Sequence, residues 1–197
     1  MNRAVVGVWR FLAGLARPSR PANARRLRKR GESVASLTIR DATAADVPAL
    51  AQLHVQTWNA TYAPLLMKGP GVELRERQWH EAFAHNDGSW FCLVVERPDG
   101  RLVGFAKGNR SDNPAYGGEL NKIYLLRQYQ GVGLGRRVLG HVARRFLCQG
   151  IDSMWLYGDA RNPSCRVWTA LGAHKTDNDP VNGNYGWRDL RELAAAP

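Results

Sequence analysis

A glycine-rich loop near the middle of the chain carries the clearest chemical pattern in this sequence. The loop contains Gly131, Gly133 and Gly135, and it lies between an apolar segment that ends at Leu125 and an amphipathic helical pattern that begins at about Leu134. Glycines let the backbone approach a ligand closely and accept positive φ angles. Free N–H groups in the first turn of a helix point toward an anion, with the positive end of the helix dipole behind them. The spacing therefore predicts a phosphate-binding turn between a strand and a helix.

The residues at fixed positions exclude two common kinds of glycine loop. The segment has no Lys-Ser/Thr pair of the nucleoside-triphosphate P-loop, and its glycines lack the third-glycine spacing of a dinucleotide fingerprint. Arg127, Arg136 and Arg137 flank the loop and add positive charge. The sequence thus favours a phosphate-bearing ligand of another kind.

The pattern that remains is Gln-x-x-Gly-x-Gly, formed by Gln130, Gly133 and Gly135. In this setting it resembles the pyrophosphate loop of the GNAT superfamily of acetyl-CoA-dependent N-acetyltransferases. A structural turn without a ligand is the alternative for this segment taken alone.

A second segment strengthens the resemblance. A strand-like run at residues 153–157 is followed by Asn162-Pro163 and by a short helical pattern that ends at Leu171-Gly172. Proline suits the first position of a helix after an Asn cap, and glycine suits the left-handed residue that ends one. This arrangement is similar to the last shared motif of GNAT proteins. The resemblance covers about residues 36–191.

The elements around these motifs can be placed from hydrophobic periodicity. Residues 36–40 are predicted to form a strand, a helical stripe runs to Trp58, and a second helix lies near residues 71–85. Residues 90–96 and 101–106 form a predicted hairpin across a Pro-Asp-Gly turn. The order agrees with the GNAT fold, which the resemblance predicts here: an α/β (α+β mixed sheet) domain whose central strands splay apart and are flanked by helices.

The resemblance implies a function and a co-substrate. It predicts an N-acetyltransferase that moves the acetyl group of acetyl-CoA to a primary amine, by direct attack in a ternary complex and without a metal. Loop amides would bind the pyrophosphate, the preceding strand edge would pair with the pantetheine arm, and Asn162 would hydrogen-bond that arm or act only as a helix cap. The predicted acetyl-CoA-binding residues are Ile123, Tyr124, Leu125, Gln130, Gly131, Val132, Gly133, Leu134, Gly135, Arg136 and Asn162.

Glu119 is the predicted catalytic base. It stands eleven residues before Gln130, where histone acetyltransferases of this superfamily carry a catalytic Glu. A partly desolvated carboxylate could have a raised pKa and accept a proton directly or through water. A solvated Glu at a strand end is the alternative.

The general acid is where the sequence departs from the family. Alignment of Leu171-Gly172 places Trp168 where GNAT enzymes commonly carry a tyrosine that protonates the departing thiolate. An indole N–H cannot give up its proton near neutral pH. Tyr157, Tyr124, Cys165 or water could replace it. This departure motivates an alternative function, a catalytically weak acyl-CoA-binding or sensing module of the same fold.

Three aromatic residues are predicted to line the acceptor site: Trp58, Tyr62 and Tyr185. Aromatic rings can stack on a substrate or surround an ammonium group, and ordinary packing is the alternative. The sequence indicates a small-molecule or peptide amine as acceptor without selecting one, and it leaves a homodimer open. His54 and His80 are interpreted as structural.

The net charge of +11 belongs mainly to the N-terminus. Nine of the 28 Lys and Arg residues lie within residues 1–30, which contain no acid, so the other 19 are nearly balanced by 17 Asp and Glu. Residues 1–35 are therefore predicted to be a basic extension, partly helical or disordered, and residues 36–197 a single domain. The extension could contact a membrane surface or nucleic acid, act in targeting, or have no function. The three cysteines lack a metal-like spacing, which favours a reduced, cytoplasmic protein.

Overall fold

The computed structural model describes residues 20–63, 67–158, 167–176 and 183–195. The first 19 residues of the predicted extension and the Asn162-Pro163 turn lie outside these ranges. The helices are α2 (Arg20–Lys29), α3 (Val47–Tyr62), α4 (Val72–Ala84), α5 (Leu134–Cys148), α6 (Val167–Ala170) and α7 (Arg191–Ala194). The strands are β1 (Thr38–Asp41), β2 (Trp90–Glu96), β3 (Leu102–Arg110), β4 (Gly118–Leu125), β5 (Met154–Leu156), β6 (His174–Lys175) and β7 (Tyr185–Trp187). Short 3-10 turns cover Val34–Ser36 (η1), Ala44–Asp46 (η2) and Arg127–Tyr129 (η4).

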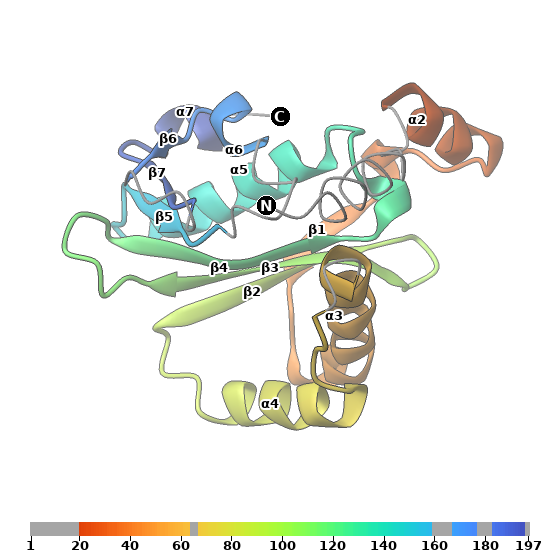
Figure 1. The fold of residues 1–197 in the computed structure, drawn as a ribbon, viewed down its shortest axis with the longest axis horizontal. Coiled ribbons are helices and arrows are strands. Elements are labelled where there is room, and N and C mark those ends of the chain that lie inside the picture. The colour runs from red at the N-terminus through yellow and green to blue at the C-terminus, as the bar shows by residue number, and fades with distance from the viewer. Residues whose placement is uncertain (1–19, 64–66, 159–166, 177–182, 196–197) are drawn as a thin grey trace, which may run out of the picture.

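In the described part of the chain the strands form one mixed sheet in the order β1-β2-β3-β4-β5-β7-β6. Only β4 and β5 are parallel, and the other neighbours are antiparallel. Figure 1 shows α5 over one face of the sheet and α3 and α4 over the other. The predicted fold class is confirmed. The chain after α6 adds one strand more than expected, because the two-residue β6 pairs with β7 as well.

The side chains of β2 show how the sheet separates two cores. Phe91, Leu93 and Val95 belong to the larger core on the α5 side. Cys92 and Val94 belong to a smaller core with α3 and α4. Because successive side chains of a strand point to opposite faces, a strand covered on both sides is a continuous apolar run.

Helix α5 lies close to the sheet because glycine faces it. A Cβ atom at Gly118 would lie 2.9 Å from the ring of Phe146, and one at Gly108 would lie 2.8 Å from the same ring. Phe146 is completely buried. Side chains on these two strand positions would push the helix away, so the two glycines set the depth at which α5 packs.

The parallel pairing of β4 with β5 is short. It consists of two residue pairs, in which Gly118–Glu119 lie opposite Met154–Trp155. From Leu120 to Leu125, β4 pairs with β3 but not with β5. The edge of β4 that faces β5 is therefore open over the stretch that leads into the glycine-rich loop. This opening is the splay between central strands that the fold class predicts.

A β-bulge lies at the start of this opening. Lys107 pairs with Lys122 and Gly108 pairs with Leu120, which leaves Asn121 without a partner residue on β3. An extra residue on one strand bends it and increases its twist. The bulge also places Leu120 on the α5 face and Lys122 on the α3–α4 face.

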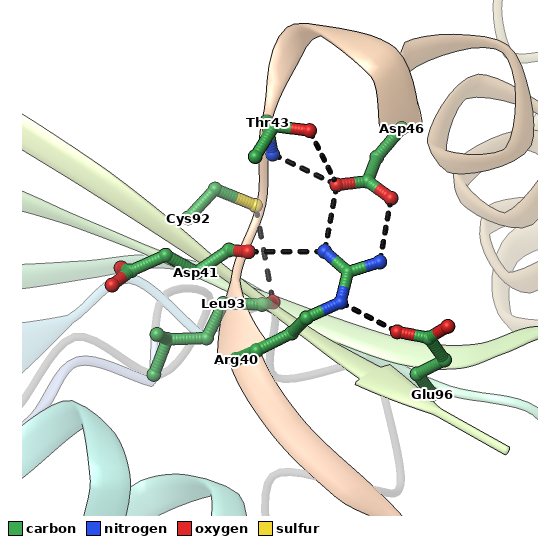
Figure 2. Close-up of polar contacts among 7 residues, drawn as sticks. All are labelled: Arg40, Asp41, Thr43, Asp46, Cys92, Leu93 and Glu96. Atoms are coloured by element: carbon green, nitrogen blue, oxygen red, sulfur yellow. Dashed lines mark hydrogen bonds and ion pairs between the residues drawn. The ribbon is translucent and has the colours of Figure 1, made fainter. Parts of the chain in front are cut away.

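An ion-pair cluster around Arg40 holds the start of α3 against the sheet edge, as Figure 2 shows. Arg40 of β1 donates two hydrogen bonds of 2.8 Å to Asp46 and one of 2.5 Å to Glu96 of β2. Asp46 also accepts from the backbone N–H of Thr43 in a capping box. The Arg40 hydrogen bonds lower the pKa of Asp46 to about 2. The cluster thereby fixes the direction in which α3 leaves β1.

None of the helices in the described ranges is both long enough and apolar enough to cross a membrane.

Candidate active site

The loop before α5 has the backbone geometry that its glycines predict. Gly131 and Gly133 have φ angles of 72° and 90°, and Gly133 is the N-cap of α5. The first helical hydrogen bond runs from the Arg137 N–H to the Gly133 carbonyl at 3.2 Å. The N–H groups of Leu134, Gly135 and Arg136 therefore have no partner within the helix. The first turn carries no acidic side chain, so this positive helix end is not neutralised locally.

The space beside the loop is open. A Cβ atom built on Gly133 would meet no atom within 4 Å, and one on Gly135 would meet only Leu125 Cδ1, at 3.9 Å. The Gln130 side chain does not enter this space, because its Nε2 donates to the Leu125 carbonyl at 2.9 Å. Gln130 thus ties the loop to the end of β4.

Helix α2 supports the loop from behind. The buried Asn23 donates both hydrogens of its amide, to the Arg127 carbonyl at 2.9 Å and to the Gln130 carbonyl at 2.8 Å. Leu27, one turn later, is buried in the larger core. The two carbonyls bracket η4, so one side chain from the basic N-terminal region fixes both ends of the turn that leads into the glycines.

A second link joins the same turn to the residues after α2. The buried Tyr129 donates its hydroxyl to Glu32, which also pairs with Arg97 at 3.3 Å. Burial, together with the hydrogen bond to Glu32, raises the pKa of Tyr129 to about 12. The tyrosine therefore stays protonated and keeps donating at physiological pH.

The three residues predicted on the β4 edge lie in the stretch that pairs with β3 but not with β5. Ile123 and Leu125 lean on the larger core, whereas Tyr124 lies in the smaller core, where its ring is 5.5 Å from that of Phe105. Burial raises the pKa of Tyr124. Backbone groups at this edge face the opening, and the Tyr124 side chain faces away from the α5 side.

Glu119 lies at the point where β4 and β5 separate. Its Oε1 accepts from Asn121 Nδ2 at 3.0 Å, and Asn121 Oδ1 in turn accepts from Lys122 Nζ. The bulge thus links the predicted base to a lysine on the same strand. Glu119 lies opposite Asn109 in the sheet register, on the face that Lys107 and Lys122 share.

A pocket of about 120 Å³ lies on that same face, between the sheet and α4. Lys107 of β3, Lys122 of β4 and Arg75 of α4 line it, together with Gln78 and His54. Burial, with the neighbouring charges of Lys107 and Arg75 adding to it, lowers the pKa of Lys122 to about 8. Burial also lowers the pKa of Lys107 and of Arg75. Three cationic side chains from three elements therefore meet at one small hollow.

His54 on α3 forms the floor between this pocket and the smaller core. The residue is 2% exposed, and its ring lies 5.2 Å from Phe105 and 5.5 Å from Tyr124. Burial, with Arg75 and Lys122 nearby, lowers its pKa to about 3. His54 is therefore neutral at physiological pH, and its Nδ1 has no hydrogen-bond partner.

The candidates for the general acid lie apart from one another. Trp168 packs against the larger core with its ring 6.3 Å from Trp187, and its Nε1 is buried without a hydrogen-bond partner. Tyr157 follows β5 and is 60% exposed. Cys165, a further candidate for the acid, lies outside the described residues. So does Asn162, the predicted contact of the pantetheine arm.

The three predicted acceptor aromatics do not form one group. Trp58 and Tyr62 stack on α3 with ring centroids 5.0 Å apart, and Trp58 lies against Gly69. Tyr185 is buried in β7, within the larger core on the other side of the sheet. The structure brings the first two together and places the third elsewhere.

The described residues contain no group of three or more His, Cys, Asp or Glu side chains placed to hold a metal ion.

Comparison with known proteins identifies the family. The sequence profile of the acetyltransferase (GNAT) family matches residues 47–173, which is more than half of the chain. The chain belongs to the GNAT acetyltransferase family. It is 29% identical over 167 residues to the uncharacterized N-acetyltransferase YuaI of Bacillus subtilis (strain 168), covering 80% of this chain and 96% of that protein.

Solved GNAT structures share the fold. The PaiA N-acetyltransferase of Thermoplasma acidophilum, in complex with coenzyme A, matches 77% of this chain and 98% of its own with a TM-score of 0.63 and 19% identity. The spermidine N-acetyltransferase of Vibrio cholerae, in complex with CoA and spermine, matches 77% of this chain and 94% of its own with a TM-score of 0.57 and 14% identity.

Sequence reasoning missed Asn23, which supports the GNAT loop, and the cationic residues that line the pocket beside Glu119. Asn23 carries no local signal, since its role comes from carbonyls more than a hundred residues away. Lys107 does carry one, because a charged residue that follows an apolar run in a strand requires a partner or a function. Lys122 carries less of a signal, because Glu119 and Asn121 lie on the same strand. Arg75 looks like any surface residue of an amphipathic helix until α4 is placed over the sheet.

We predict that Asn23→Ala weakens the loop. The change removes two hydrogen bonds to carbonyls and should lower the free energy of unfolding by about 1–3 kcal/mol. Amide exchange at Gly131–Gly133 should become faster. Arg28→Ala, an exposed change on the same helix, is the control. Equal urea midpoints and exchange rates for both variants would show that Asn23 does not hold the turn.

We predict that His54 makes stability depend on pH between about 6.5 and 4. The unfolded chain binds a proton at His54 below its usual pKa, whereas the folded protein does not until about pH 3. The free energy of unfolding should therefore fall as the pH falls, by up to about 1.4 kcal/mol per pH unit. Asp46 acts in the same direction only below its usual pKa of 3.8.

Urea unfolding of the parent and of His54→Leu across this range measures the effect. His141, whose pKa burial also lowers, is present in both proteins and cancels in the difference. Parallel curves of unfolding free energy against pH for the two proteins would refute the assignment of this pH dependence to His54.

Proposed function

We propose that this GNAT protein transfers the acetyl group of acetyl-CoA to a primary amine by direct attack in a ternary complex. One observation carries the proposal: the uncapped N-terminus of α5 and the open edge of β4 lie at the two ends of the same glycine loop. A helix end of this kind suits a pyrophosphate, and a free strand edge suits an amide-bearing chain. Acetyl-CoA contains both groups in that order.

The loop residues fit the pyrophosphate by an independent criterion. The space over Gly133 and Gly135 is open because neither residue has a side chain, and any side chain at these positions would occupy it. The coenzyme A bound to the structural relative from Thermoplasma acidophilum is consistent with this ligand class. Arg136, exposed in the first turn, adds a positive charge at the helix end.

Glu119 is the residue that we assign to proton removal. The acceptor nitrogen must lose its proton to attack the thioester carbonyl, and a carboxylate at the entrance of the β4–β5 opening is placed to accept it directly or through water. Asn121 holds one carboxylate oxygen at 3.0 Å, which leaves the other oxygen available. The C–S bond then breaks and the thiolate leaves.

The missing tyrosine at Trp168 does not prevent this reaction. A thiol has a pKa near 8.5, so its thiolate is a tolerable leaving group at neutral pH and can take a proton from water. Trp168, packed against Trp187, shapes the site and does not act as the acid.

The acceptor is an amine. A relative of this fold is a spermidine N-acetyltransferase. Homodimerisation, membrane or nucleic-acid contacts of the basic extension at residues 1–35, and cytoplasmic localisation stay predictions. The roles of Asn162 at the pantetheine arm and of Trp58 and Tyr62 at the acceptor mouth stay predictions. The predicted acceptor role of Tyr185 rests on the sequence resemblance alone, because its buried ring lies on the other side of the sheet.

We predict that Gly135→Asp abolishes coenzyme A binding. Gly135 has an ordinary helical φ, and a Cβ there meets only one atom at van der Waals distance. The fold should therefore survive, while the new carboxylate occupies the pyrophosphate site and repels the pyrophosphate of CoA. Calorimetric titration with CoA measures the loss. Gln52→Asp, on an exposed position of α3, adds the same charge elsewhere and should bind normally. Equal CoA affinities of Gly135→Asp and the parent would contradict the assignment of this loop to pyrophosphate binding.

We predict that Glu119→Gln lowers kcat/KM for the amine roughly ten- to a thousandfold and leaves CoA affinity unchanged. Glutamine preserves the contact with Asn121 and removes the base, so the variant should also lose the acidic limb of the pH–rate profile. Glu81→Gln on the exposed side of α4 is the control. A pH–rate profile of Glu119→Gln like that of the parent contradicts the role of Glu119 as base. If the parent binds CoA but releases no thiol from acetyl-CoA with any amine, the protein is a binding module.

A further inference from the structure

The cationic pocket beside Glu119 has no use in the acetyl transfer just described. Its three cations, Arg75, Lys107 and Lys122, come from α4, β3 and β4 and line a space of about 120 Å³. Among the lining residues there is no acid. The ion pairs within 4.0 Å that the described residues form all involve other side chains.

Direct contacts with neutral groups hold each of these side chains in place. Arg75 Nη1 donates to Gln78 Oε1 at 2.9 Å, and Lys122 Nζ donates to Asn121 Oδ1. The Lys107 ammonium lies 4.5 Å from the centre of the Trp90 ring. These partners are neutral. The charge of Glu119 offsets part of the lowering of the pKa that burial causes at Lys107 and Lys122, so one carboxylate serves three cations. Partial burial of such an excess of positive charge opposes folding, so its retention indicates a function.

A neutral, buried group in the same wall strengthens this argument. His54 lines the pocket, is 2% exposed and has a ring nitrogen without a hydrogen-bond partner. An imidazole that stays neutral offers one donor or one acceptor according to its tautomer. The wall therefore combines three cationic side chains with an unsatisfied polar group, which is the composition expected around an anion and not around another cation.

The position of the pocket ties it to the acceptor. Lys122 stands three residues after Glu119 on the open stretch of β4, and Asn121 connects the two side chains. A molecule whose amine lies beside Glu119 would place a group a few bonds away in the pocket. The volume suits a single small anionic group.

Resting on the proposed function, we infer that the amine acceptor carries an anionic group, a carboxylate or a phosphate, which binds between Arg75, Lys107 and Lys122. The substrate class is thus a small zwitterionic amine, such as an amino acid or a phosphorylated amino alcohol. A polyamine would bring further positive charge to the same three cations and is disfavoured.

Thiol release from acetyl-CoA measures the preference with matched acceptors. The panel contains α-amino acids with their carboxamides, phosphoethanolamine with ethanolamine, and spermidine. We expect kcat/KM to be at least tenfold higher for the anionic member of an accepted pair, and the pair that responds distinguishes carboxylate from phosphate. Equal or better turnover of the uncharged members, or of spermidine, overturns the inference and leaves the proposed acetyl transfer intact.

Variants locate the effect. Arg75→Met and Lys107→Met should each lower kcat/KM for the anionic acceptor about ten- to a hundredfold, as expected for a lost charge-assisted hydrogen bond, with unchanged CoA affinity. Arg77→Met, exposed on the same helix, is the matched control and should behave like the parent. If both pocket variants fold, by circular dichroism, and keep the parent preference, the pocket does not bind the acceptor.

A binding measurement separates this inference from the proposed function. With the protein saturated by CoA, acetate and inorganic phosphate are titrated by calorimetry. Saturable binding of either anion that Arg75→Met and Lys107→Met both weaken supports the pocket even if no amine is acetylated. Absence of binding for both anions, together with no preference in the acceptor panel, refutes it.

Discussion

The early end of the parallel pairing between β4 and β5 is the constraint on which the rest of the site depends. Two residue pairs join the strands at Gly118–Glu119, and the next six residues of β4 face no neighbour on that side. An unpaired strand edge inside a sheet is a ready hydrogen-bonding surface. The opening starts at the predicted base and ends at the glycine loop, so this one interruption in the strand pairing lies between the two parts of the proposed site.

Positive charge is distributed around this opening in two ways. The N-terminus of α5 supplies backbone N–H groups and no side-chain cap, while the pocket on the opposite face supplies Arg75, Lys107 and Lys122. The sheet separates them. In the arginine-rich helix α2, by contrast, the neutral Asn23 donates the hydrogen bonds that hold the turn before the glycine loop. The net charge of the chain is therefore a poor guide to which positive groups act in the site.

The fold and the loop were predictable because their signals are local. Gly131 and Gly133 adopt the positive φ angles that only glycine accepts easily, and Gly172 does so after α6. The continuous apolar run of β2 marks a strand that is buried on both faces, and the apolar stripe of α5 repeats with the helical period. The sequence did not predict β6, a two-residue strand that exists because β7 pairs with it. Tyr185 was grouped with Trp58 and Tyr62, although the sheet separates their positions.

The sequence by itself determined the family fold, the strand–loop–helix turn with its glycines and the position of Glu119 on the strand before it, because backbone conformation and side-chain periodicity are encoded within a few residues. Only the tertiary structure decided what surrounds them. The register shift at Asn121 turns Lys122 toward Lys107, and the packing of α4 brings Arg75 over both. Asn23 meets carbonyls 104 and 107 residues away. Such contacts depend on strand register, helix placement and burial, which are set by the whole chain at once.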